Sequence, residues 1–136
     1  MLRNIPPALS PELVKALMEM GEGDEIVLAE ANLPAHSIHH QVIRADGVPL
    51  TTLLEAVLQV MPLDHNSDEQ VVLVAPEDGD APACWAEYER IWGSDVAAEA
   101  LPRPAFYENL VGAAVVVVTG TTTRDSSVVL RKGTLD

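Results

Sequence analysis

The sequence has little cysteine and few basic residues, and each shortage excludes a class of protein. Its 136 residues include one cysteine, Cys84, which has no partner for an internal disulfide, so we expect a reducing compartment. Eight Lys and Arg residues stand against 21 Asp and Glu residues, which leaves a net charge of −13. Because the few cations are spread along the chain, we expect neither nucleic acid nor an anionic membrane as a partner.

Long apolar segments are missing as well. The longest, residues 113–118, is far shorter than the roughly 20 residues that span a bilayer. Residues 1–7 contain no apolar run suited to a signal peptide. We therefore expect a cytoplasmic protein of one domain, residues 1–136, since domains cluster at about 100–150 residues.

The pattern of apolar residues predicts a layered α/β fold. A helix is expected to begin at Ser10 and Pro11, which are typical of a helix start, and to end at Gly21. Apolar residues at helical spacing predict a second helix after Pro49. Two more helices are expected, one through Trp85, Tyr88 and Trp92 and one over 105–110. Strands are predicted at 25–29, 41–44, 71–75, 113–119 and 128–130. Because strands alternate with helices, the sheet should be largely parallel.

The segment 21–25 combines two glycines with three carboxylates, those of Glu22, Asp24 and Glu25. Crowded carboxylates raise the pKa of one another, so this turn is a candidate for a general acid or base. The alternative is a solvated acidic turn without a chemical role.

Three histidines, His36, His39 and His40, have the spacing of metal ligands on one helical face. Pro34 and the short length of the segment argue against a regular helix there. We therefore favour loop or interface histidines and predict no metal site.

The segment 120–127 is rich in hydroxyl groups, which suits a neutral polyhydroxylated ligand as well as a plain polar hairpin. Arg103, between two prolines, is either a sugar-binding cation or a salt-bridge partner. Phe106 and Tyr107 are expected in the core, and Cys84 is expected to be a buried small residue without an activating neighbour.

Seven different short motifs lie along the chain, from one end to the other. They lie at 2–13, 21–26, 31–37, 41–47, 105–108, 118–120 and 130–133. In this order they resemble the family of D-ribose pyranases and L-fucose mutarotases, RbsD/FucU, and are closer to the L-fucose branch. The resemblance implies a single RbsD-like domain of three layers, α/β/α. It also implies a homo-oligomer, commonly a decameric ring with sites near subunit boundaries, that interconverts forms of an unmodified monosaccharide without a cofactor.

The resemblance also implies site residues, most of them altered in this chain. The family's catalytic histidine corresponds to Glu22, and its sugar-binding aspartate to Glu30. Its arginine is retained as Arg103. The family's Tyr-Gly-Asn triplet, which contacts sugar, is replaced by three residues: Asp125, Ser126 and Ser127.

These departures leave three readings of the site. The first, which we predict, is a mutarotase-like isomerase for L-fucose, with D-ribose second, in which Glu22 transfers protons. If Glu22 converges with Glu30 and Asp125, the neighbouring charges would raise the pKa of Glu22 enough for it to act as an acid. The second reading is a non-catalytic monosaccharide-binding protein on the same scaffold. The third is a carboxylate site for Ca²⁺ or Mg²⁺.

Overall fold

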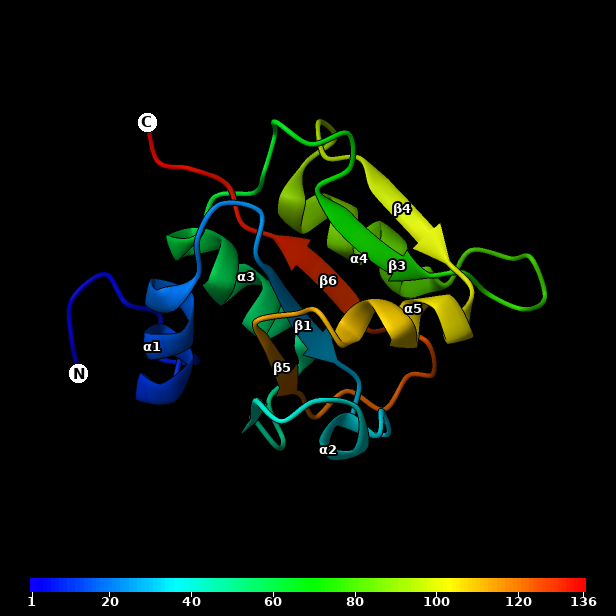
Figure 1. Ribbon diagram of the computed structural model, residues 1–136, viewed down its shortest axis with the longest axis horizontal. Helices are drawn as coiled ribbons and strands as arrows, with labels where there is room; N and C mark the ends of the chain where they lie inside the picture. The colour runs from blue at the N-terminus through cyan, green and yellow to red at the C-terminus, as the bar shows by residue number, and fades with distance from the viewer.

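In the computed structural model, which describes residues 1–136, six strands lie side by side in one sheet (Figure 1). Across the sheet the order is β2 (Val42–Arg44), β5 (Val115–Val118), β1 (Glu25–Ala29), β6 (Val128–Arg131), β3 (Val71–Val74) and β4 (Ala98–Leu101). Strand β6 runs antiparallel to both of its neighbours, and the other pairs are parallel. The largely parallel sheet predicted from the sequence is confirmed.

Helices cover both faces of this sheet. One face carries α1 (Pro11–Glu19), α3 (Leu50–Val60) and α4 (Ala83–Trp92), and the other carries α2 (Ala35–Ile38) and α5 (Arg103–Leu110). Successive side chains of a strand point to opposite faces. Accordingly, Ile26 and Leu28 of β1 pack with the first group of helices, whereas Val27 and Ala29 pack with the second. The three-layer α/β/α architecture is therefore confirmed.

The elements form for the reasons that the sequence indicates. The Ser10 hydroxyl accepts a hydrogen bond from the Leu13 amide at 3.2 Å and caps α1. Strands β3 and β5 consist almost entirely of valine and are buried at every residue, as expected for strands covered on both faces. None of the helices is both long and apolar enough to cross a bilayer.

Two short elements differ from the sequence prediction. Strand β4 was not expected, because its Ala-Glu-Ala-Leu sequence has no β-branched residue. It forms because an edge strand needs only one partner, and here residues 98–101 pair in parallel with β3. A single helical turn, α2, follows Pro34, where we expected no regular helix.

Close backbone packing at Gly120 provides a test of the fold. A Cβ atom on Gly120 would lie 2.7 Å from the Cα atom of Gly47, so a side chain there forces two loops apart. We expect Gly120→Ala to lower the free energy of unfolding by roughly 1–3 kcal/mol, measured by urea denaturation. The control is Gly112→Ala, where an added Cβ meets nothing within 4 Å. Equal stability of the two variants would contradict the close packing.

Candidate functional site

Charged side chains gather where the parallel strands end. Glu30 follows β1, Arg103 follows β4, and Asp125 precedes β6. Leu28 pairs with Val128, so the antiparallel β6 begins at the edge where β1 ends. In open α/β sheets, ligands bind outside the carboxyl ends of the strands. A hollow of about 240 Å³ lies at this edge and is lined by six residues: Glu30, Asn32, Arg103, Tyr107, Arg124 and Asp125.

An ion pair between Arg103 and Asp125 forms one wall of the hollow. Arg103 donates from Nε and Nη2 to the two carboxylate oxygens of Asp125, at 3.0 and 2.8 Å. The side chains are 26% and 19% exposed. Hydrogen bonding to Asp125 raises the pKa of the Arg103 guanidinium. Such a two-pronged pair fixes the plane of both groups. Arg103 is therefore both a salt-bridge partner and a lining residue of the hollow.

Hydrogen bonds of Ser126 and Ser127 fix the loop that carries Asp125. Asp125 itself has a φ of 57°, a left-handed conformation that aspartate tolerates better than most residues. Next to it, Ser126 donates its hydroxyl to the Thr123 carbonyl at 2.6 Å, and its own carbonyl accepts a hydrogen bond from the Tyr88 hydroxyl at 2.7 Å. Ser127 accepts a hydrogen bond from the Glu30 amide at 2.9 Å. Ser126 and Ser127 are buried and use their hydroxyls inside the chain.

Glu30 forms the second acidic group of the hollow. Its side chain accepts a hydrogen bond from the Asn32 amide at 2.9 Å, and the residue is 7% exposed. A carboxylate that already has one donor keeps further lone pairs for a ligand hydroxyl. The hollow therefore offers acceptors on Glu30 and donors on Arg103 within one small space.

The hollow is also lined by three residues that were not predicted as site residues: Asn32, Arg124 and Tyr107. Arg124 lies within the segment 120–127, which was predicted as a candidate for ligand binding. We expected Phe106 and Tyr107 in the core. Phe106 is fully buried there, whereas Tyr107 is half-buried, packs against the same hydrophobic cluster and also lines the hollow. One signal for Tyr107 was present in the sequence. Residues four apart lie on the same face of a helix, so Tyr107 lies above Arg103 on α5.

Glu22 does not join these residues within one chain. It is exposed in the turn that precedes β1, whereas Glu30 follows the same strand. At about 3.3 Å per residue, the two ends of the strand are roughly 16 Å apart. Figure 1 shows the turn before β1 and the loop before β6 at opposite ends of the sheet. The expected convergence of Glu22 with Glu30 and Asp125 is therefore wrong for a single chain.

Of the three histidines, His39 has a structural role. Its Nε2 atom donates to the Ala113 carbonyl at 2.7 Å, and Nδ1 accepts from the Gln41 amide at 2.8 Å. Its ring also stacks on that of His40, with centroids 4.8 Å apart. Both nitrogens of His39 are thus engaged by the backbone, and no cluster of three or more His, Cys, Asp or Glu residues forms a metal site.

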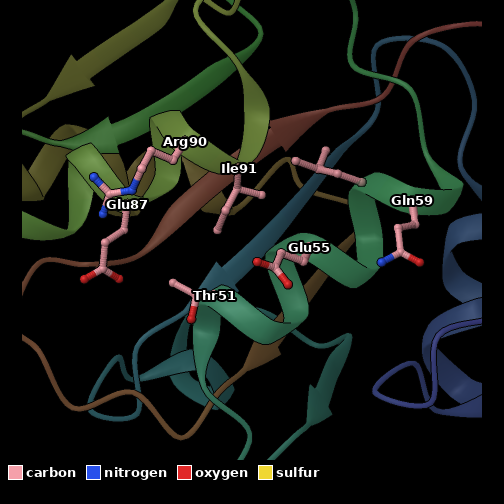
Figure 2. A pocket seen from close by; sticks show the side chains of 7 residues that line it. Thr51, Glu55, Gln59, Glu87, Arg90 and Ile91 are labelled. Atoms are coloured by element: carbon pink, nitrogen blue, oxygen red, sulfur yellow. The ribbon is translucent and has the colours of Figure 1, made fainter.

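A hollow of about 670 Å³ lies between α3 and α4, away from the residues described above. Figure 2 shows Thr51, Glu55 and Gln59 on one helix and Glu87, Arg90 and Ile91 on the other. Its charged lining side chains, Glu55, Glu87 and Arg90, are exposed. None of the residues that the sequence predicts for a site contributes to it.

Comparison with known proteins is consistent with this arrangement. The model of the RbsD / FucU transport protein family matches residues 3–135. The chain belongs to the RbsD/FucU family. An L-fucose mutarotase of Glaesserella parasuis is 41% identical over 98% of this chain and 95% of the relative. Two solved RbsD/FucU structures also match this chain over nearly its whole length.

The first of these structures is the fucose mutarotase of Streptococcus pneumoniae in complex with L-fucose. It has a TM-score of 0.93 and 38% identity, and the match covers 99% of this chain and 100% of that one. The second is RbsD of Bacillus subtilis complexed with D-ribose, with a TM-score of 0.79 and 25% identity over 94% of this chain and 95% of that one. The RbsD/FucU fold expected from the motifs is confirmed.

Proposed function

We propose that this protein is a mutarotase-type isomerase that interconverts the anomers of an unmodified aldose, with L-fucose preferred and D-ribose second. The observation that carries the proposal is the 41% identity to an L-fucose mutarotase over 98% of the chain. It is supported by a hollow lined with hydrogen-bonding groups at the carboxyl edge of the sheet.

The hollow suits a neutral polyhydroxylated molecule. Sugar hydroxyls both donate and accept, and the carboxylates of Glu30 and Asp125 supply acceptors while Arg103 supplies donors. The bidentate pair with Asp125 occupies Nε and Nη2 of Arg103. Nη1 lies 3.7 Å from Oε1 of the exposed Glu77, a loose pair that a sugar oxygen can replace. Ser126 and Ser127, predicted from the family triplet to bind sugar, support the site by fixing the loop that carries Asp125.

The position of Glu22 favours an oligomeric enzyme. Since Glu22 is too far from the hollow of its own chain, it can act on the sugar only from a second copy. We infer that the protein forms a homo-oligomer, a decameric ring by its resemblance to the family, with Glu22 of one copy facing the hollow of another. Exposed apolar side chains of Met1, Leu2 and Met18 support self-association.

The reaction needs two proton transfers and no cofactor. Ring opening requires that a proton leave the anomeric hydroxyl and that another reach the ring oxygen, and each acid or base group contributes about 10²–10⁴-fold. We propose that Glu22 accepts the first proton. The cytoplasmic location expected from the single cysteine is part of this proposal.

Exchange spectroscopy tests the function directly. In NMR experiments on equilibrated L-fucose and D-ribose, the protein should accelerate exchange between anomers, and Glu22→Gln should abolish the acceleration. The control is Glu89→Gln, which changes an exposed glutamate on α4 that does not line the hollow. A wild-type protein that accelerates exchange of no common aldose would rule the proposal out.

The same experiment distinguishes a second function. Glu22 replaces the family's histidine, and Asp125 already occupies Arg103, which favours a sugar-binding protein without catalysis. That function predicts saturable binding in calorimetry together with an unaccelerated exchange rate.

A further inference from the structure

We propose that Tyr107 is a further catalytic residue, whose phenol hydroxyl donates a proton to the ring oxygen of the bound sugar. This inference rests on the proposed function, because it assigns the second of the two proton transfers. It goes beyond the site residues that the resemblance implies, whose side chains are carboxylates, one guanidinium and two serine hydroxyls.

Tyr107 is well placed for this role. It lies on α5 one turn after Arg103, so the two side chains share a helix face, and both line the hollow with Glu30. Phe106, the next residue on the same helix, points into the core and is fully buried. Packing of Phe106 thereby fixes the rotation of α5 and directs the half-buried Tyr107 to the hollow.

The hydroxyl of Tyr107 is available to a ligand. The only other tyrosine, Tyr88, is fully buried and donates its hydroxyl to the Ser126 carbonyl at 2.7 Å. The Tyr107 hydroxyl has no side-chain hydrogen-bond partner in the chain. Only partial burial and nearby charges shift the pKa of its phenol. Its phenol proton is therefore uncommitted within the chain.

The charges around Tyr107 come from each of the neighbouring segments. Arg103 lies on α5, Glu30 follows β1, and Arg124 and Asp125 lie in the loop before β6. Burial raises the pKa of the Tyr107 phenol, which is also raised by the two carboxylates and lowered by the two guanidinium groups. A phenol with a raised pKa keeps its proton at neutral pH.

Among the side chains that line the hollow, Tyr107 is the one suited to donate a proton. The other lining side chains of the hollow are carboxylates, which accept protons, guanidinium groups, which do not give them up, and the amide of Asn32. The phenol is the one neutral acid among them. It donates to an alkoxide that forms on the sugar only during ring opening, which places the interaction in the transition state.

The step is balanced. The Glu22 carboxylate of a second copy takes the proton of the anomeric hydroxyl, the bond between C1 and the ring oxygen breaks, and C1 becomes an aldehyde. The ring oxygen receives the Tyr107 proton and becomes a hydroxyl. Ring closure on the other face of the aldehyde returns both protons, so that enzyme and sugar recover their original protonation.

Removal of one hydroxyl tests the inference. We expect Tyr107→Phe to lower the catalysed exchange rate of L-fucose at saturation by about 10²-fold, while the Michaelis constant and the thermal unfolding midpoint change little. The control is Glu108→Gln, which alters an exposed residue of the same helix that does not line the hollow. Its exchange rate should equal that of the wild type.

A second variant separates acid strength from packing. Incorporation of 3-fluorotyrosine at position 107 keeps the shape of the side chain and lowers the pKa of its phenol, so the basic limb of the pH–rate profile should move to lower pH. A wild-type rate in Tyr107→Phe, or an unmoved basic limb in the fluorinated protein, overturns the role of Tyr107 and leaves the mutarotase activity standing. A wild-type protein without exchange activity overturns both.

Discussion

Replacing Arg103 by alanine should weaken both sugar binding and the folded state. A hydrogen bond to a charged group contributes about 1.5–3 kcal/mol, so loss of the guanidinium should reduce the apparent affinity for L-fucose by roughly 10–100-fold. The carboxylate of Asp125, 19% exposed, also loses both of its hydrogen bonds from Arg103 and keeps only Arg124 at 3.9 Å, which should cost about 1–3 kcal/mol of unfolding free energy. Calorimetric sugar titration and urea denaturation measure the two effects.

The chain contains a matched control for this variant. Like Arg103, Arg44 pairs with an aspartate: its Nη2 atom lies 2.7 Å from Oδ1 of Asp46. These two side chains, however, are 49% and 67% exposed. Exposed pairs contribute about 0–1 kcal/mol because water screens the charges. Arg44→Ala should therefore retain sugar affinity and most of the stability. If both variants bind sugar equally well, Arg103 is not a binding residue.

Replacing Phe106 by alanine should produce the largest loss of stability. Phe106 lies on α5 and is completely buried, in the hydrophobic cluster between this helix and the sheet that also contains Val72, Val74 and Val116. A buried phenylalanine replaced by alanine costs about 3–5 kcal/mol, because a cavity remains in addition to the lost transfer free energy. The urea midpoint should fall accordingly, with an unchanged slope if the transition stays two-state.

Val111 provides the control for that measurement. It follows the same helix and is 67% exposed, so Val111→Ala should change the free energy of unfolding by less than about 0.5 kcal/mol. A loss in Phe106→Ala no greater than in Val111→Ala would show that α5 does not depend on this contact. It would also remove the reason given above for the direction of Tyr107.

Local sequence was sufficient for most of the elements. The cap at Ser10, the apolar stripe of residues 50–60 and the valine-rich strands each carry their structural preference within a few residues. Strand β4 lacks such a preference, since its alanines and glutamate would be equally acceptable in a helix. Pairing with β3, a contact about 27 residues away in sequence, is what makes it a strand.

The candidate site was predicted in part. The resemblance identified Glu30, Arg103 and Asp125, which the structure brings to one hollow, and it identified Glu22, which the structure separates from them. Sequence motifs and their spacing do not show which strand ends lie at the same edge of the sheet. Tyr107 was not predicted as a site residue because adjacent aromatic residues are typical of a hydrophobic core. Its spacing from Arg103 nevertheless places both residues on one face of α5.

The shortages of cysteine and cations by themselves set what to expect of the redox environment and of anionic partners, because composition sets redox requirements and long-range charge regardless of the fold. Helices, most strands and family membership were also readable in the chain. Tertiary structure alone decided which charges become neighbours. Because β6 inserts antiparallel between β1 and β3, the loop with Asp125 meets Glu30 and Arg103. The length of β1 meanwhile keeps Glu22 at the opposite edge of the sheet, away from the hollow.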